Sequence, residues 1–118
     1  MGSAHNLGII GEEVALSFLS GLGYQLLEKN YRSRFGEIDL IMQDGRVLVF
    51  IEVKARRSTL YGVPQEAVGA VKQAKIRRVA EQYLQYKGKE DCQLRFDVVA
   101  VRFHKTGNCT IDHFKSAF

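Results

Sequence analysis

Residues 35–54, which read FGEIDLIMQDGRVLVFIEVK, decide the fold that this sequence predicts. Two apolar runs flank Asp44-Gly45, and an Asp-Gly pair between β-type runs is a strong signal for a hairpin with a two-residue turn. Counting outward from that turn places Glu37 opposite Glu52. Because side chains alternate between the two faces of a strand, one face of the hairpin is uniformly apolar and the other ends in charged residues. The apolar face comprises Ile38, Leu40, Met42, Val47, Val49, Ile51 and Val53.

The charged end of the hairpin brings together Glu37, Asp39, Glu52 and Lys54. Like charges directly opposite each other destabilise a sheet, and Asp39 lies diagonal to Glu52, within reach of a shared ion. Three carboxylates beside one ammonium require either protonation or a cation, and hard oxygen ligands suit Mg²⁺, Mn²⁺ or Ca²⁺. We therefore expect a Mg²⁺ (or Mn²⁺) site with Asp39, Glu52 and the carbonyl of Val53 as ligands. The alternative interpretation is a solvated, ion-paired end of the sheet without a metal.

Length and composition indicate one globular domain that spans residues 1–118. The chain is 46% apolar and 25% charged, which is ordinary for such a domain. No apolar run is long enough to cross a bilayer and the N-terminus shows no secretory signal, so we expect a cytoplasmic protein without a membrane partner. Cys92 and Cys109 lack the spacing of a zinc site. We expect the histidines His5, His104 and His113 at the surface.

Basic residues surround the acidic cluster in the sequence. The chain has 17 basic and 13 acidic residues, a net charge of +4, and many of the basic residues lie in its middle. Cations around a group of carboxylates suit a polyanion held over a metal ion. We therefore expect a nucleic acid partner, with ordinary solubilising charge as the alternative. The expected phosphate-binding residues are Arg32, Arg34, Arg56, Arg57, Lys72 and Lys75.

Apolar periodicity and breaks at Gly or Pro divide the rest of the chain into helices and strands. The pattern predicts helices over residues 6–20 and 64–86, the second beginning at Pro64 with a candidate break near Gly69. It predicts strands over residues 24–30, 94–103 and 109–114, and a polar loop over residues 55–63. The order α-β-β-β-α-β-β indicates an α/β fold, a mixed central sheet flanked by helices. The buried stripes of the two helices are expected to contain Leu7, Gly11, Val14, Ala15, Phe18 and Leu22, and Val68, Val71, Ile76, Val79, Ala80, Tyr83 and Leu84.

The first predicted helix contributes one more acidic side chain to the expected site. At about 100° per residue, Glu12 falls beside the apolar stripe, whereas Glu13 points to solvent. If the helix packs near the acidic end of the sheet, Glu12 reaches the ion. The alternative is a first-turn carboxylate that is favoured by the helix dipole.

These residue types suit the hydrolysis of a phosphodiester bond. A divalent ion polarises the phosphoryl oxygen and acidifies a bound water, and Glu12 or Glu37 would hold the ion directly or through water. Lys54 follows Glu52 by two residues on the same face, where its ammonium would stabilise charge that develops on the phosphate. Other mechanisms lack their motifs, since the chain has no Gly-x-Ser-x-Gly elbow, no P-loop and no Trp for a sugar platform. The expected catalytic residues are Glu12, Glu37, Asp39, Glu52 and Lys54.

The spacing between Asp39 and Glu52-Val53-Lys54 resembles the metal-dependent nuclease signature PD…(D/E)xK of the restriction-endonuclease-like superfamily, with Ile38 in place of the proline. Nearly the whole chain is similar to the YraN-like family of predicted endonucleases, an uncharacterised protein family. The pieces that carry this resemblance are Gly8-x-x-Gly11-Glu12-x-x-Ala15, Gly23-Tyr24, Asn30-Tyr31-Arg32, Gly36-Glu37-Ile38-Asp39-Leu40-Ile41, Val49-Phe50-Ile51-Glu52-Val53-Lys54-x-Arg56, Gly62, Val68 with Lys72, Ala80, Tyr83-Leu84, Arg95-Phe96-Asp97-Val98-Val99 and Ala117-Phe118.

The resemblance implies the α-β-β-β-α-β core of restriction-endonuclease-like enzymes. It also implies a metal-dependent endonuclease that hydrolyses phosphodiester bonds in DNA, with branched or damaged DNA in repair or recombination as its substrate. The chain is similar to archaeal Holliday-junction resolvases, whose first-helix acid would correspond to Glu12, and Asp39, Glu52 and Lys54 would take catalytic positions. Two alternatives stay open: a non-catalytic nucleic-acid-binding module with a nuclease-like fold, and a purely structural scaffold. A homodimer would fit a two-fold symmetric junction, although no apolar surface stripe in the sequence indicates one.

Overall fold

A computed structural model describes residues 4–58 and 68–118 of the chain. In sequence order its elements are α1 (Ala4–Gly21), β1 (Gln25–Ser33), β2 (Gly36–Asp44), β3 (Val47–Arg57), α2 (Ala70–Lys87), β4 (Gln93–Phe103) and β5 (Cys109–Phe114). The predicted order of helices and strands is confirmed, and the last strand has the predicted bounds. No helix in the described part of the chain is long and apolar enough to cross a membrane.

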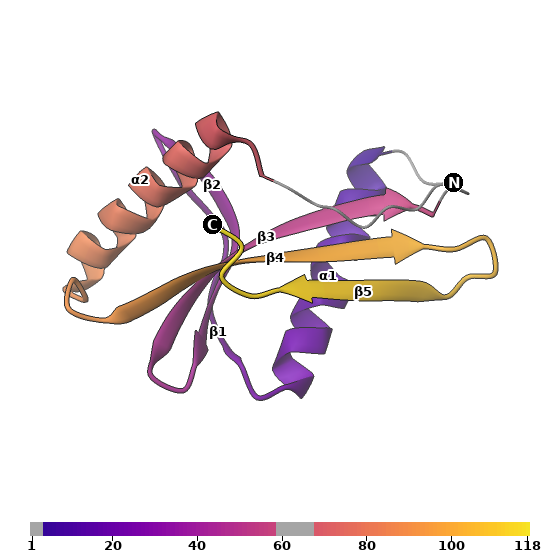
Figure 1. The fold of residues 1–118 in the computed structure, drawn as a ribbon, viewed down its shortest axis with the longest axis horizontal. Coiled ribbons are helices and arrows are strands. Elements are labelled where there is room, and N and C mark those ends of the chain that lie inside the picture. Colours follow the sequence, from indigo (N-terminus) through magenta and orange to yellow (C-terminus); the bar gives the residue numbers. More distant parts are fainter. Residues whose placement is uncertain (1–3, 59–67) are drawn as a thin grey trace.

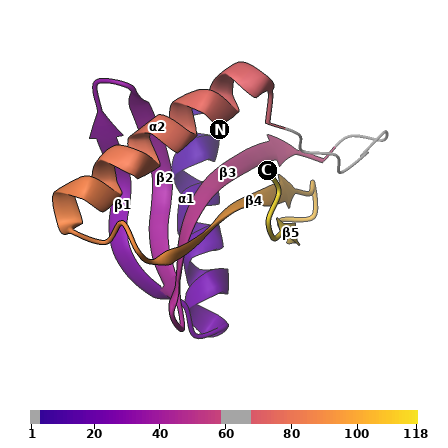
Figure 2. The same ribbon diagram turned by 60° about the vertical axis from the view of Figure 1, so that its left-hand side comes forward.

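The five strands form one mixed sheet in the order β1-β2-β3-β4-β5. Neighbouring strands are antiparallel except β3 and β4, which run parallel. Parallel neighbours need a long crossover connection, and the segment that contains α2 supplies it. α1 and α2 lie on opposite faces of the sheet (Figure 1 and Figure 2). The predicted mixed α/β fold with helices on the sheet is therefore confirmed.

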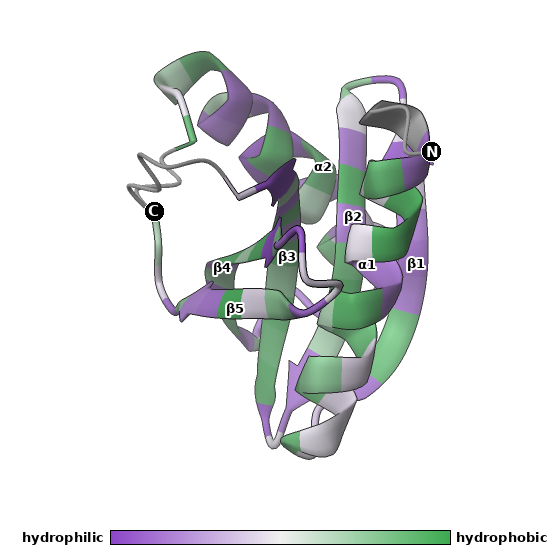
Figure 3. Cartoon of the chain, turned by 90° about the vertical axis from the view of Figure 1, so that its right-hand side faces the viewer, coloured by the Kyte–Doolittle hydropathy of each residue, from purple (hydrophilic) through white to green (hydrophobic). Residues whose placement is uncertain are grey.

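Each helix covers its own hydrophobic core. Beneath α1, Ala15 and Leu19 pack with a set of strand residues that includes Leu40, Met42, Val49, Ile51, Val99 and Val101. Beneath α2, Ile76, Val79 and Tyr83 pack with another set that includes Ile41, Leu48, Phe50, Phe96 and Val98. The central strands are buried on both faces, and Figure 3 shows them as predominantly hydrophobic. A charged side chain on these strands therefore needs a specific partner.

The second helix begins later than the sequence predicted. α2 starts at Ala70, after an extended Gly69 at its N-cap, and the predicted start at Pro64 lies outside the described residues. Val71, expected in the buried stripe, is exposed because it lies on the flank of α2 away from Ile76 and Tyr83. The helix ends at Gly88, which adopts the left-handed conformation typical of a helix C-terminus.

Two further expectations about buried and exposed segments are wrong. Leu22 lies beyond the end of α1 and is exposed, while Leu19 is fully buried in its place. β3 continues through Arg57, so residues 55–57 are strand instead of polar loop. Parallel pairing with β4 holds this end of β3 in place, and that long-range contact leaves no signal in the local composition. Residues 59–63 of the predicted loop lie outside the described residues.

The β2–β3 hairpin has a register two residues away from the predicted one. Asp44 pairs with Val47, so Gly45 and Arg46 form the two-residue connection. Gly45 has a φ of 61°, and tight hairpin turns favour such a conformation at their first central residue. The predicted pairing of Glu37 with Glu52 is therefore wrong. Because the shift is even, side chains keep their faces within the paired region.

The alternation of faces is interrupted near Asp39. Lys29 pairs with Leu40 and Tyr31 with Ile38, and Asn30 between them has a φ of 53°. Ile38 packs in the core beneath α2 although Leu40 belongs to the core beneath α1. The prediction that both residues share one face is therefore wrong, because strict alternation stops between them. Asp39, the residue in between, is left free to direct its side chain toward β3.

Candidate functional site

The candidate site lies at a fork between β2 and β3. The pairing of the two strands runs from the turn to Leu40 and Ile51. At the next position, Asp39 Oδ2 accepts a hydrogen bond from the backbone N–H of Val53 at 2.8 Å. A side chain thus replaces the backbone acceptor where the strands part, and Figure 2 shows β2 and β3 diverging beyond this point. The fork exposes polar groups at the centre of an otherwise apolar sheet.

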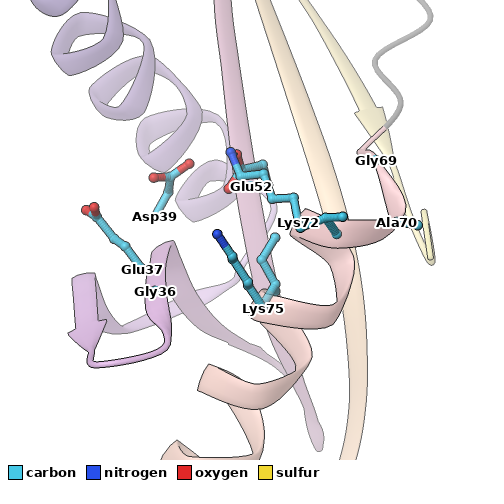
Figure 4. A pocket seen from close by; sticks show the side chains of 10 residues that line it. Gly36, Glu37, Asp39, Glu52, Gly69, Ala70, Lys72 and Lys75 are labelled. Atoms are coloured by element: carbon cyan, nitrogen blue, oxygen red, sulfur yellow. The ribbon is translucent and has the colours of Figure 1, made fainter.

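A pocket of about 650 Å³ opens at the fork beside the N-terminal part of α2. This volume falls within the range of roughly 300–1,000 Å³ that is typical of small-ligand sites. Figure 4 shows Asp39, Glu52, Lys72 and Lys75 directed into the same space from β2, β3 and α2, while Glu37 points away from Glu52. The pocket is lined by Gly36, Glu37, Asp39, Glu52, Gly69, Ala70, Val71, Lys72, Lys75 and Ile76.

Glu52 is the most buried carboxylate of the pocket, with only 7% of the residue exposed. Its Oε2 forms an ion pair with Nζ of Lys72, whose side chain stays half exposed at the start of α2. A buried carboxylate without such a partner would be strongly destabilising. Lys72 therefore stands beside Glu52, the position that the sequence suggested for Lys54. Lys54 is half-buried on β3 and is not among the residues that line the pocket.

Asp39 is held in surroundings that disfavour its charged form. Burial raises the pKa of this carboxyl, and the neighbouring charge of Glu52 adds to the rise, to about 8. Glu12 raises the pKa of Asp39 further, while the Val53 N–H and the charge of Lys72 lower it. Both desolvation and nearby like charge act in the same direction here. The pocket thus has less positive charge than its carboxylates require.

Two more carboxylates border the fork and are joined by Asn30. Its side-chain amide donates to Glu12 Oε1 at 3.0 Å and to Glu37 Oε2 at 3.2 Å, in the orientation that avoids placing its oxygen against other acceptors. Glu12 is half-buried and Glu13 exposed, as the helical spacing predicted. No role was predicted for Asn30, and in the structure its left-handed backbone marks it.

A close helix–strand contact determines where Glu12 lies. A Cβ placed on Gly11 would lie 2.5 Å from Cβ of Ala55, far too near for any real pair of side chains. Glycine therefore allows α1 to approach β3 at this point. The next residue along the helix is Glu12, so this contact brings its carboxylate within electrostatic range of Asp39. Gly11 was expected on the buried stripe, and it is buried.

The predicted basic residues do not form a single patch. Lys72 and Lys75 line the pocket. Arg32 lies at the end of β1, 3.7 Å from Glu37, and Arg34 follows in the turn to β2. Arg56 and Arg57 lie at the far end of β3, which Figure 1 and Figure 2 place well away from the β1–β2 turn. The list of expected phosphate-binding residues thus divides into three groups around the fork.

A metal centre is not assembled in advance within residues 4–58 and 68–118. There, no three Asp, Glu, His or Cys side chains lie close enough together to hold one ion. Asp39 and Glu52 nevertheless supply two hard oxygen donors to one pocket. Mg²⁺ commonly takes one or two protein carboxylates and completes its shell with water and substrate phosphate. The donor set therefore suits Mg²⁺ or Mn²⁺ together with an anionic substrate.

A second charged cluster, which the sequence patterns do not indicate, lies on the opposite face of the sheet. Asp97 is fully buried and accepts hydrogen bonds from Arg95 Nε at 2.9 Å and from the Ser116 N–H at 3.1 Å. His113 Nε2 lies 2.7 Å from Asp97 Oδ2, and its ring packs edge-on against Phe18. The expectation that His113 lies at the surface is wrong, because β5 turns its side chain inward onto Asp97. The side chain of His104 is half-buried beside Thr110, and that of His5 lies outside the described part.

The fold and the pocket define a mixed α/β domain with an open site that joins acidic and basic side chains. The sequence model of the uncharacterised protein family UPF0102 matches residues 11–101. A UPF0102 protein of Syntrophus aciditrophicus is 50% identical over 111 residues, which cover 94% of this chain and 87% of the relative. UPF0102 proteins of Chlorobium chlorochromatii and Geobacter sulfurreducens are 47% and 44% identical, over 98% and 99% of this chain and 93% of each relative.

The chain therefore belongs to the UPF0102 family. The YraN-like family membership that the sequence motifs predicted is confirmed.

Proposed function

We propose that this protein is a Mg²⁺- or Mn²⁺-dependent endonuclease that hydrolyses phosphodiester bonds in DNA, with branched or damaged DNA in repair or recombination as its substrate. The observation that carries the proposal is the convergence of Asp39 and Glu52 in one open pocket with Lys72 and Lys75. The carboxylates are donors for a hard cation, and the lysines are partners for a phosphate.

The order of elements adds support from the fold. An α-β-β-β-α-β succession with a parallel pair after the second helix is what the restriction-endonuclease-like superfamily would require, and β5 extends it. In that interpretation Asp39 and Glu52 carry the metal-binding positions of the PD…(D/E)xK signature. The displaced register matters here, because it brings Asp39 rather than Glu37 to the level of Glu52.

Each charged residue of the pocket has a role that follows from its surroundings. A bound divalent ion would polarise the phosphate and acidify a water molecule. Asp39 and Glu52 would hold that ion, and the Val53 N–H fixes the orientation of Asp39. Lys72 neutralises Glu52 in the metal-free protein, and with Glu52 engaged by an ion it would be available to bind the phosphate, beside Lys75. Lys54 lies on the same strand as Glu52. Its positive charge would stabilise the negative charge that develops on the phosphate.

The flanking residues fit a substrate larger than a nucleotide. Glu12 and Glu37, which the Asn30 amide holds by donating to both, would contact the hydrated ion through water. Arg32 and Arg34 on one side of the fork, and Arg56 and Arg57 on the other, would bind phosphates further along the backbone. Contacts of this kind give affinity without sequence preference. We therefore expect the shape of the DNA rather than its sequence to select the substrate.

A cleavage assay tests the proposal directly. Supercoiled plasmid and a synthetic four-way junction are incubated with Mg²⁺ or Mn²⁺ and with wild-type protein, Asp39→Asn or Glu13→Gln. We expect Glu13→Gln, whose carboxyl points to solvent on α1, to cleave like the wild type. Asp39→Asn should lose cleavage by at least about 100-fold, which corresponds to about 2.7 kcal/mol in the barrier. Equal cleavage by wild type and Asp39→Asn would reveal contaminating activity and defeat the proposal.

The second candidate is a nucleic-acid-binding module that does not cut. The ion pair between Glu52 and Lys72 favours it, since it satisfies the buried carboxylate without a metal. Calorimetric titration with Mg²⁺ and Mn²⁺ separates the two candidates. Heat that is lost in Asp39→Asn supports the nuclease, whereas no heat together with salt-sensitive DNA binding supports the module.

A further inference from the structure

A second, smaller pocket lies beside the candidate active site on the same side of the sheet. Its volume is about 320 Å³, at the lower end of the range for ligand sites and suited to one base-sized group. β1 and the turn that follows supply one wall and the C-terminal half of α2 supplies the other, and Figure 2 shows this part of α2 passing over β1. The pocket is lined by Tyr31, Arg32, Ser33, Arg34, Gln82 and Tyr86.

The lining combines the groups that recognise a nucleobase. Tyr86 is 75% exposed, which is unusual for so large an aromatic side chain, and the Lys87 ammonium lies 5.3 Å from its ring centroid. Gln82 lines the pocket, and its Oε1 is buried without a hydrogen-bond partner among the described residues, so a rotation of this amide toward the pocket would let the oxygen accept from a ligand. Tyr31 adds a second ring, held edge-on against Tyr83 at 5.1 Å. An aromatic face, an unused amide oxygen and nearby guanidinium groups are what stacking and phosphate contacts to an unpaired nucleotide require.

One flank of α2 connects the two pockets. Lys75, Arg78, Gln82 and Tyr86 are spaced by three, four and four residues, so they lie in a row along the helix. Lys75 lines the larger pocket, and Gln82 and Tyr86 line the smaller one. Lys75 and Gln82 are two helical turns apart, about 10 Å, which is the length of about three stacked nucleotides. A single strand can therefore follow this row from one pocket to the other.

The space between the pockets is occupied by a rigid cationic ridge. Phe35 lies in the β1–β2 turn, with the Arg78 guanidinium 4.2 Å and the Arg34 guanidinium 5.0 Å from its ring centroid. Stacking on an aromatic ring holds an arginine in place while its charge stays accessible. Arg34 and Arg78 are thus positioned to bind the phosphates between a base in the small pocket and a bond at Asp39 and Glu52.

We propose that the pocket between β1 and α2 binds one unpaired nucleobase by stacking on Tyr86, so that the preferred substrate is DNA with a short single-stranded branch. This inference rests on the proposed nucleic-acid substrate and adds the class of structure that is recognised. A fully paired duplex offers no free base to the pocket, whereas a flap, gap or junction arm does.

Binding in the absence of metal tests the inference independently of cleavage. The probes are a short duplex and the same duplex with a single-stranded flap that carries 2-aminopurine, both in EDTA. The wild type should bind the flap more tightly than the duplex by at least about five-fold, and stacking should quench the 2-aminopurine fluorescence. Tyr86→Ala should lose both the preference and the quenching, and Tyr86→Phe should keep them.

A matched control and the contrary outcomes make the test decisive. Leu22→Ala removes another exposed apolar side chain, at the end of α1 on the other side of the sheet, and should bind like the wild type. Equal binding of flap and duplex by the wild type, or an unchanged preference in Tyr86→Ala, overturns the inference even if the protein cleaves DNA. Preference and quenching that depend on Tyr86 in a protein without cleavage would support the base pocket and reject the nuclease.

Discussion

Asp39 and Asp97 are carboxylates on opposite faces of one sheet, and their surroundings move their pKa in opposite directions. Asp97 is completely buried, which alone would raise its pKa, yet hydrogen bonds from His113, Arg95 and the Ser116 N–H together lower it. Asp39 is less buried, but its pKa rises to about 8, because burial and the charge of Glu52 outweigh the Val53 N–H and Lys72. Hydrogen-bond donors offset the cost of burial at Asp97, whereas the charge of Glu52 adds to that cost at Asp39, and this separates the two sites.

This difference separates a cluster that is suited to stabilising the fold from one that is suited to binding a ligand. The network around Asp97 is complete: Arg95 also donates to Tyr24 Oη at 2.8 Å, and the network ties β4 to β5 and to the residues after it. The cluster around Asp39 is short of positive charge and opens into a pocket. Carboxylates that a fold leaves uncompensated in a cleft are characteristic of binding and catalytic sites.

The largest effect is expected from Asp97→Asn. The substitution removes the carboxylate nearest to Arg95 and leaves only Asp44, at 3.4 Å, beside this largely buried charge, so the free energy of unfolding should fall by about 3–5 kcal/mol. Urea denaturation followed by circular dichroism measures this change. Glu90→Gln, at an exposed position before β4, is the matched control and should leave the midpoint unchanged. A loss below about 1 kcal/mol would mean that the network does not stabilise the fold.

The opposite titration of the two carboxyls can be observed directly in the metal-free protein. Carbon-detected NMR should find the pKa of Asp97 below its ordinary value and that of Asp39 above it, near 8. Because the pKa of Asp97 is lowered by folding, the stability it contributes is complete above the ordinary value of 3.8 and is lost as the pH falls through its lower folded value. Shifts of the same sign for both residues would remove the contrast.

An intermediate effect is expected from Gly11→Ala. The added methyl group collides with Ala55, so α1 must move away from β3 and the protein should lose about 1–3 kcal/mol, although alanine itself favours a helix. Ala55→Gly in the same chain removes the opposing methyl group and should recover most of the loss. Thermal unfolding of the two variants measures the coupling. Equal stability of Gly11→Ala and its double variant would show that the two positions do not touch.

Asp39→Asn should stabilise the protein where Asp97→Asn destabilises it. The folded pKa of Asp39, about 8, lies above the ordinary value, so the fold favours the protonated carboxyl and its cost is greatest above pH 8. An amide oxygen can still accept from the Val53 N–H without carrying charge. Urea unfolding in EDTA at about pH 9 should show a gain of about 1–2 kcal/mol. A loss of stability there would mean that the Asp39 charge is already compensated.

The smallest effect on stability is expected from Arg32→Ala. Its ion pair with Glu37 is exposed and 3.7 Å long, so the free energy of unfolding should change by less than about 0.5 kcal/mol. If the proposed function holds, DNA affinity should fall for all sequences alike. The slope of the logarithm of the binding constant against the logarithm of the salt concentration should become smaller in magnitude by about one. A salt titration by fluorescence anisotropy measures this. A stability change above about 1 kcal/mol would place Arg32 among the structural residues instead.

Local patterns predicted the elements of this fold, and non-local contacts account for what they missed. The Asp-Gly signal identified the hairpin, and alternation placed Glu52 correctly on the face opposite Val49 and Ile51. Local counting could not reveal that Gly45 takes the first turn position, because Asp44-Gly45 and Gly45-Arg46 are both acceptable turns. The face change beside Asn30 and the strand at residues 55–57 depend on pairing with neighbouring strands, which leaves no mark on the sequence nearby.

The candidate site shows the same limit. Asp39 and Glu52 could be paired from the sequence because one hairpin carries both. The partner of Glu52 could not be predicted in this way. Lys72 lies on α2, twenty residues further along the chain, whereas Lys54 is the cation nearest to Glu52 in sequence. The cluster around Asp97 was missed for a similar reason, because His113 meets Asp97 only once β5 has paired with β4. Contacts within one hairpin were predictable, and those across the crossover were not.

The parallel alignment of β3 with β4 also dictates an order of assembly. Short turns connect β1, β2 and β3. In contrast, α2, which carries Lys72 and Lys75, and β4 pack against these strands only after the long connection that follows β3. Since closing long loops is entropically slow, Asp39 and Val53 should meet early, and Lys72 should reach Glu52 late. Amide protection that appears in β4 before β2 during refolding would contradict this sequence of events. In a partly folded chain the carboxylates of Asp39 and Glu52 would therefore lack the positive charge of Lys72. The last step of folding would bring this lysine in and complete the pocket.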